Sequence, residues 1–145
     1  MPKTINQIQD EIVAEFKSLT NWDDKYALII KQGKALNAIE PQYQTEEYEV
    51  KGCQSTVWMH AENKTNGTIL FHADSDALIV RGLIALLLRV YSNQSAQAIV
   101  DTAPNFLDRI EMSHHLSMQR SNGLAAMIKQ MKLYAQVFTI QAKLS

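Results

Sequence analysis

The chain lacks a second cysteine, since Cys53 is the only one among its 145 residues. A single thiol excludes an intramolecular disulfide, and it cannot supply the four thiolates that usually hold an iron–sulfur cluster. Four histidines are present, but the pair His114-His115 has neither the flanking cysteine nor the acid spacing of a zinc site. We therefore predict no metal site.

Strong charge and a phosphate loop are also missing. Lysine and arginine number 14 against 15 aspartates and glutamates, and the formal net charge is -1. No long-range field therefore favours nucleic acid or an anionic membrane as a partner. None of the five glycines fits a Walker or dinucleotide-binding pattern.

Long hydrophobic runs are absent as well. The most apolar stretch, "ALIVRGLIALLLRVY" at 77–91, is shorter than the roughly 20 residues that span a bilayer, and two arginines interrupt it. The first sixteen residues contain acids and polar side chains where a secretory signal needs an apolar core. We predict a buried helix at 77–91, no membrane partner, and a reduced, cytoplasmic protein.

What is present suits one domain over residues 1–145, because 46% hydrophobic residues suffice for one core. Thr4 and Gln7 have the spacing of a capping box, which predicts a first helix to about Leu19. Asn21 should cap a second helix, and an apolar stripe predicts a long final helix from about Ser117.

Between these helices the hydrophobic period changes to two. Alternation predicts strands at about 46–51, 57–62 and 69–73, and Asn66-Gly67 predicts a type I′ hairpin turn. Asp74 or Ser75 should cap the helix that follows, with Asp76 in its first turn. The sequence thus predicts an α+β fold, a three-stranded antiparallel meander packed with N-terminal and C-terminal helices.

The segment 52–55 should join the first two strands, which places Cys53 at the tip of a turn. Buried free cysteine usually acts as a small hydrophobe, whereas Gly52 before it allows close approach of another backbone or a substrate. Donors from Lys51, Gln54 and Ser55, or from Arg120 if the fold brings it near, could stabilise a thiolate. The residues alone leave both alternatives open, a reactive thiol and core filler.

Four blocks together resemble one known family. The stretch "GCQSTVW" at 52–58 resembles the active-site loop of the SufE family of sulfur-acceptor proteins. The blocks "NWDDKY" at 21–26, "DSDALIVRGLIALL" at 74–87 and "RSNGLAAMI" at 120–128 are similar to further family blocks, in the same order. The resemblance extends from about the first helix to Tyr134.

This resemblance implies a fold similar to the IscU-type scaffold proteins and a role in iron–sulfur cluster assembly. Cys53 would take sulfane sulfur as a persulfide from a SufS-type cysteine desulfurase and pass it to a scaffold such as the SufBCD complex. Pyridoxal phosphate belongs to the desulfurase, so no cofactor is expected in this chain. In the family the cysteine loop is tucked against an apolar surface and is exposed for transfer.

The resemblance also implies a docking surface around Cys53. Its residues would bind the partner or support the loop. They are Gly52, Gln54 and Ser55 of the loop, Asp74 and Asp76 at the next helix start, and the corner formed by Arg120 and Ser121. Long cationic side chains are mostly solvated, so an exposed Arg120 without a partner is the alternative.

Other functions stay open at this point. One is a CsdE-type acceptor, and another is a regulatory module that binds a desulfurase without carrying sulfur. An independent thiol enzyme is disfavoured, because His60 and His72 lie on predicted hairpin strands and neither is a credible general base. We expect a sulfur-transfer protein that acts with its partner, as a monomer or a weak dimer.

Overall fold

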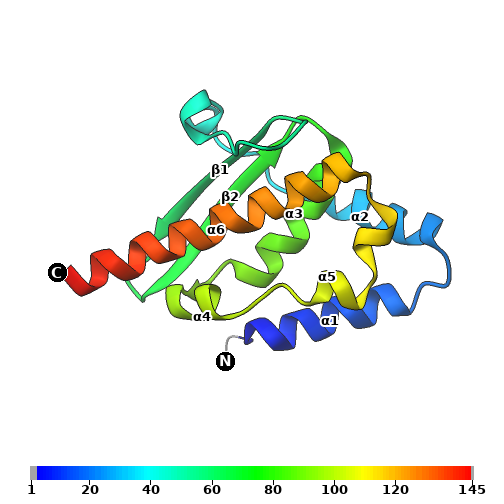
Figure 1. Cartoon of the computed structure of the whole chain (residues 1–145), viewed down its shortest axis with the longest axis horizontal. Coiled ribbons are helices and arrows are strands. Elements are labelled where there is room, and N and C mark those ends of the chain that lie inside the picture. Colours follow the sequence, from blue (N-terminus) through cyan, green and yellow to red (C-terminus); the bar gives the residue numbers. More distant parts are fainter. Residues whose placement is uncertain (1–2, 145) are drawn as a thin grey trace.

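The computed structural model describes residues 3–144 and confirms the predicted α+β fold, with helices packed around a three-stranded antiparallel sheet of order β1-β2-β3 (Figure 1). Its α-helices are α1 (Ile5–Lys17), α2 (Trp22–Ala35), α3 (Leu78–Tyr91), α4 (Ala96–Asp101), α5 (Phe106–Arg109) and α6 (Met118–Leu144). The strands are β1 (Val57–Asn63), β2 (Thr68–Ser75) and β3 (Gln94–Ser95), and three 3₁₀ turns are η1 (Pro41–Tyr43), η2 (Glu46–Tyr48) and η3 (Met112–His115).

Strands β1 and β2 form the predicted hairpin, with Val57 opposite Ser75 and Asn63 opposite Ile69. The predicted type I′ turn is wrong. Such a turn needs positive φ at both central residues, and of the pair Asn66-Gly67 only Gly67 has it, at 85°. Lys64 N donates to Thr68 O at 2.8 Å, so three residues form the loop and only its glycine adopts the left-handed conformation.

The predicted first strand at 46–51 is also wrong. That segment contains η2 and a single bridge between Glu49 and Trp58, and the third strand of the sheet is β3, which pairs with the start of β2. The alternation has another cause, because Val50 is buried in the core whereas the ring of Tyr48 packs edge-on against His60, 5.8 Å between centroids. β3 has two residues, too few for a period to be read.

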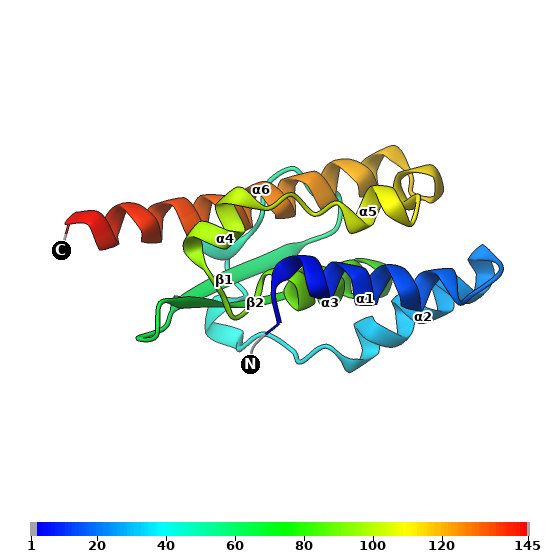
Figure 2. The ribbon, with the colours of Figure 1, turned by 90° about the horizontal axis from the view of Figure 1, so that it is seen from below.

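The two faces of the hairpin have different covers. On the apolar face, the hydroxyl of Tyr134 in α6 donates a hydrogen bond to Met59 O at 3.2 Å, and its ring packs against Phe71. Figures 1 and 2 both show α6 running over β1 and β2. On the polar face, the ring of Tyr43 stacks on His60 at 4.0 Å. The hairpin is therefore fixed between α6 and the segment that precedes the cysteine loop.

The predicted helix caps are confirmed at two helices. Thr4 and Gln7 form the complete capping box of α1, and Asn21 Oδ1 accepts from Asp24 N at 2.8 Å at the start of α2. The predicted start of α3 is wrong. This helix begins at Leu78 without a side-chain cap or an acid in its first turn, because Asp74 and Ser75 belong to the end of β2.

Helices α2 and α3 approach each other closely through two glycines. A Cβ added at Gly33 would lie 2.8 Å from the backbone atoms Gly82 N and Leu78 O. Helix α3 is largely buried, as predicted for 77–91. Within residues 3–144 we find no helix with the length and apolar character needed to cross a bilayer.

Candidate functional site: the Cys53 loop and its cavity

Cys53 lies near the tip of a loop that precedes β1. The loop is closed at its base, where Val50 N donates to Val57 O at 2.8 Å. Gly52 has a φ of 94°, a conformation that side chains with a Cβ rarely adopt, so glycine is needed for the chain to turn at this point. The predicted position of Cys53 in a loop is thus confirmed, although only one bridge pairs the segment before it with β1.

The loop rests on two small residues of α6. The Cys53 thiol is half-buried and donates to Gly123 O, with 3.5 Å between Sγ and the oxygen. A Cβ added at Gly123 would lie 3.5 Å from the same Sγ, and a Cβ added at Gly52 would lie 3.4 Å from Cβ of Ala126. The cysteine loop is thus in ordinary van der Waals contact with these two small residues of α6.

Burial sets the protonation state of the resting thiol. It raises the pKa of Cys53, since the thiolate loses more hydration than the thiol, and the hydrogen bond to the Gly123 carbonyl also requires the proton. Lys51, a predicted thiolate stabiliser, instead has its ammonium 3.5 Å from Glu49 and 3.9 Å from Glu46. The thiol is therefore protonated at neutral pH in this position, where it is a poor nucleophile.

A cavity of about 340 Å³ adjoins the thiol. Its walls come from the cysteine loop, from α3 and from the start of α6. Its polar rim contains Gln54, Ser55, Ser117, Gln119 and Arg120, and its apolar lining contains Val57, Val80, Leu83 and Met127. The fold thus brings Arg120 to the same cavity as Cys53, as the sequence could only suggest.

Sequence reasoning missed the apolar lining of this cavity. Val80, Leu83 and Met127 are ordinary apolar members of helical stripes, and nothing in their spacing distinguishes a residue beside a cavity from one in the core. Gly123 lies near the start of the predicted final helix, and it is buried beside the thiol, where a Cβ would touch Cys53 Sγ at 3.5 Å. A glycine within a predicted helix is the one available signal.

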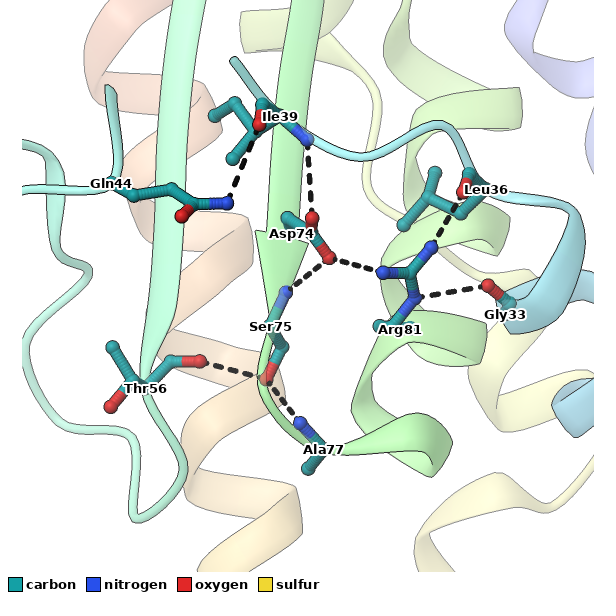
Figure 3. Close-up of polar contacts among 9 residues, drawn as sticks. All are labelled: Gly33, Leu36, Ile39, Gln44, Thr56, Asp74, Ser75, Ala77 and Arg81. Carbon is teal, nitrogen blue, oxygen red and sulfur yellow. Dashed lines mark hydrogen bonds and ion pairs between the residues drawn. The ribbon is translucent and has the colours of Figure 1, made fainter. Parts of the chain in front are cut away.

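Asp74 does not lie on the predicted docking surface. Its side chain is buried and forms an ion pair with Arg81, whose Nη1 lies 2.8 Å from Asp74 Oδ1 (Figure 3). Asp74 Oδ2 accepts from Ile39 N at 3.1 Å, and Arg81 also donates to the carbonyls of Gly33 and Leu36. A carboxylate with only 3% of its residue surface exposed connects β2, α3 and the segment after α2 instead of contacting a partner.

The next two residues hold the base of the cysteine loop. Ser75 Oγ donates to Thr56 O at 2.7 Å and accepts from Ala77 N at 3.2 Å (Figure 3). Asp76 Oδ1 accepts from Thr56 N at 3.2 Å. Asp76 is exposed, so it can contact the loop base and solvent at once, unlike Asp74.

The remaining predicted residues divide by exposure. Gln54 and Arg120 are exposed at the rim of the cavity, Ser55 is half-buried there, and Ser121 is half-buried outside the cavity lining. No group of three or more histidine, cysteine or acidic side chains suited to a metal ion occurs within residues 3–144. The site therefore offers one thiol, a mixed cavity and an exposed cation.

The chain is similar to known proteins in sequence and in fold. The chain is 39% identical over 132 residues to an uncharacterized SufE-like protein of Rhizobium etli, covering 88% of this chain and 89% of that protein. Its fold is similar to the solution structure of a hypothetical protein from Thermus thermophilus, with a TM-score of 0.74, 18% identity, and coverage of 89% of this chain and 93% of that one. The model of the SufE family, described as an Fe-S metabolism associated domain, matches residues 10–135. The chain belongs to the SufE family.

Proposed function

We propose that this protein is a sulfur acceptor and activator of a cysteine desulfurase in iron–sulfur cluster assembly. The observation that carries the proposal is the placement of its only cysteine, at the tip of a glycine-hinged loop and beside a cavity that an exposed arginine borders. Membership of a family associated with iron–sulfur metabolism supports the same role. The sulfur-carrying atom would be Cys53 Sγ.

The chemistry needs one thiol and no second cysteine. A desulfurase holds sulfur as a persulfide on its own cysteine, and the Cys53 thiolate attacks the outer sulfur of that persulfide. A sulfur–sulfur bond forms on Cys53 while the bond on the desulfurase breaks, and the electron pair leaves with the desulfurase thiolate. No electrons are gained or lost overall. Because the chain has no neighbouring thiol, the new persulfide cannot be consumed as an internal disulfide.

The cavity suits protection of that product. A persulfide is readily reduced or oxidised in open solvent, and the apolar lining formed by Val80, Leu83 and Met127 offers the outer sulfur a place beside Sγ that is less accessible than open solvent. Return of the loop to α6 would shield the outer sulfur between two transfers. Movement away from Gly123 would expose it to the desulfurase or to a scaffold such as SufBCD.

Two features support a gated loop. The tip is attached to α6 by a single sulfur hydrogen bond, which is weak, while strands and side chains fix the base. The raised pKa also makes the seated Cys53 thiol a poor nucleophile. Sulfur transfer therefore requires a second position of the loop. Hydrogen exchange at 52–55 should increase when a SufS-type desulfurase is added, and equal exchange with and without it would contradict the gate.

The decisive experiment is intact-protein mass spectrometry without reductant. The protein is incubated with L-cysteine and a catalytic amount of a SufS-type desulfurase, beside the Cys53→Ser variant, and a parallel sample contains a CsdA-type desulfurase. We expect a gain of one sulfur atom that peptide mapping places at Cys53 and that the variant lacks. The two desulfurases distinguish a SufE-type from a CsdE-type acceptor.

The same variant tests the alternative function. A half-buried, protonated thiol is also what a purely structural cysteine would show, so a regulatory module that binds the desulfurase without carrying sulfur is the second candidate. If the protein were such a module, the native chain and the Cys53→Ser variant would stimulate cysteine desulfuration to the same extent. Stimulation that survives in the variant, together with no sulfur on the native chain, would replace the acceptor by the regulator.

A further inference from the structure

The C-terminal half of α6 has an apolar face that residues 3–144 leave uncovered. Figures 1 and 2 both show the last turns of this helix extending beyond the rest of the ribbon. Four large apolar side chains remain exposed there, Leu133 at 42%, Val137 at 48%, Ile140 at 57% and Leu144 at 82%. Single exposed apolar residues are common, but four on one helix face are a feature that marks interaction sites.

The spacing of these residues aligns them. Starting from Ala126, steps of four and three residues alternate through Gln130, Leu133, Val137, Ile140 and Leu144. This period keeps all six on one stripe, which we call the α6 seam, and at 1.5 Å per residue it is about 27 Å long. The opposite side of the helix packs on its own domain, through Met127, Met131 and Ala135. From Leu133 onward the seam is thus exposed and lies on the side of the helix away from the core.

One end of the seam lies at the proposed sulfur-transfer site. Its first member, Ala126, is the residue on which Gly52 of the cysteine loop rests. A partner that reaches Cys53 by displacing this loop therefore meets the start of the seam and can continue along it. The seam therefore runs along one side of α6 from the cysteine loop to Leu144.

Charge defines the chemistry of the partner. Helix α6 contains no aspartate or glutamate in its 27 residues. Lys129, Gln136 and Lys143 recur every seven residues along one border of the seam, and all three are exposed. A complementary surface has an apolar groove with carboxylates along the matching border.

The size of the seam argues against a second copy of this chain as its occupant. Stable interfaces bury about 800 Å² per partner from some 20–30 residues, and four apolar side chains are too few for that. A membrane is also a poor candidate for the occupant, because interfacial helices insert a broad apolar face, whereas the seam is a single narrow stripe along α6. An extension of a larger interface, centred on the cysteine loop, suits this size.

We propose that the α6 seam docks the desulfurase that donates sulfur to Cys53, and that this desulfurase contributes an apolar groove bordered by carboxylates. The inference rests on the proposed function and adds a contact up to about 27 Å of helix away from the thiol. The seam contributes affinity, whereas Cys53 performs the transfer. Changes in the seam therefore alter the concentration that transfer requires and leave its final extent unchanged.

The test uses the full chain and a SufS-type desulfurase, with persulfide on Cys53 measured by quenched intact-protein mass spectrometry over a range of acceptor concentrations. The double variant Val137→Glu/Ile140→Glu removes two apolar contacts and places acids opposite acids. We expect its apparent KM to rise about tenfold or more, with the same final extent of persulfide at saturation. Lys129→Glu/Lys143→Glu should raise KM to a smaller degree, and added salt should reduce that second effect.

A matched control is Ala14→Glu/Ala27→Glu, which adds the same two charges at exposed positions of α1 and α2. Its titration should match that of the native chain. If the seam variant also matched the native chain, the seam would not be a contact, although the sulfur-acceptor function would stand. No persulfide on the native chain at any concentration would overturn the function and the seam proposal with it.

Sedimentation distinguishes the other occupants. A native chain that forms dimers at working concentrations, with Val137→Glu/Ile140→Glu remaining monomeric, would assign the seam to self-association and overturn the proposal. Binding to anionic phosphatidylserine vesicles that the same variant abolishes would assign the seam to a membrane surface and overturn it as well. We expect a monomer that does not bind vesicles.

Discussion

The tip and the base of the cysteine loop are built in opposite ways. At the tip, Cys53 makes one long hydrogen bond to Gly123 and is half-buried. At the base, Thr56 is bonded to both Ser75 and Asp76. Below it, a buried ion pair fixes the end of β2 to α3 and to the segment after α2.

This difference places mobility where the chemistry needs it. Segments with few buried contacts open at low cost in free energy, while multiply bonded elements open only with the whole fold. A reactive residue on a loosely attached tip can reach a partner, and a fixed base returns it to the same cavity. The predictions below test the base, then the tip, then the segment that leads into the loop.

The largest expected effect is at the base. Arg81→Met would leave the Asp74 carboxylate buried without its ion pair, and it would also remove the donors to the carbonyls of Gly33 and Leu36. Loss of one partner of a buried pair costs about 3–5 kcal/mol. Chemical unfolding followed by circular dichroism should show this decrease in the free energy of unfolding.

Arg89→Met is the control, because Arg89 pairs with Glu15 at a site where both side chains are about a third exposed. We expect this pair to contribute about 1 kcal/mol or less. Equal losses in the free energy of unfolding for the two variants would show that the buried Asp74–Arg81 pair stabilises the loop base no more than a partly exposed ion pair does.

A smaller effect is expected at the tip. Gly52→Ala strains a residue at φ 94°, a conformation that side chains with a Cβ rarely adopt, so the backbone should relax and the loop should leave its seat on α6. Release restores hydration to the thiolate, which lowers the raised pKa of Cys53 toward its ordinary value of about 8.5. Alkylation by iodoacetamide at about pH 7.5 should become severalfold faster, and its pH midpoint should fall.

Gly67→Ala is the matched control for strain. Gly67 has a similar φ of 85°, lies in the β1–β2 turn, and has open space where a Cβ would be. Both variants should lose about 1 kcal/mol of stability from the left-handed conformation. Only Gly52→Ala should change the alkylation of Cys53, and the same acceleration in Gly67→Ala would indicate general loosening of the fold.

Local signals explain which parts of the fold the sequence could predict. The Thr4 capping box, the Asn21 cap and the β1–β2 hairpin depend on neighbours within a few residues, and all three are confirmed. The strand predicted at 46–51 and the start of α3 failed for a common reason. Side chains there satisfy contacts more distant in sequence, such as Tyr48 with His60 and Asp74 with Ile39.

The site divides in the same way. The sequence located Cys53, its glycine and the loop, because a lone thiol after glycine stands out from its surroundings. It could not show that Asp74 is buried, nor that the α6 carbonyl of Gly123 meets the thiol, since a separation of 70 residues lies between the two partners. Such contacts follow from how helices pack, which no period along the chain encodes.

The smallest expected effect is in the segment that leads into the loop. His60 lies under the stacked ring of Tyr43, with His72 5.8 Å away on the neighbouring strand. Burial, and next the charge of His72, lower the pKa of His60, although Glu62 and Glu40 oppose this. The neutral ring is thus favoured in the fold, so stability from this residue is present above the unfolded pKa of about 6.5 and is lost as pH falls through the lower, folded value.

Tyr43→Ala should hydrate His60 and raise its pKa, whereas Tyr43→Phe keeps the stacked ring and should change it little. The titration of the imidazole Cε1–H signal by NMR measures both variants against the native chain. Protection of the amides at 41–48 from hydrogen exchange, corrected for the intrinsic pH dependence of exchange, should also fall modestly below about pH 6 in the native chain, because cationic His60 loses hydration under Tyr43 and lies beside the charge of His72. A native His60 with a pKa at or above about 6.5 would show that the ring of Tyr43 does not shield it from solvent. The segment 41–48 would then be as loosely attached as the tip of the cysteine loop.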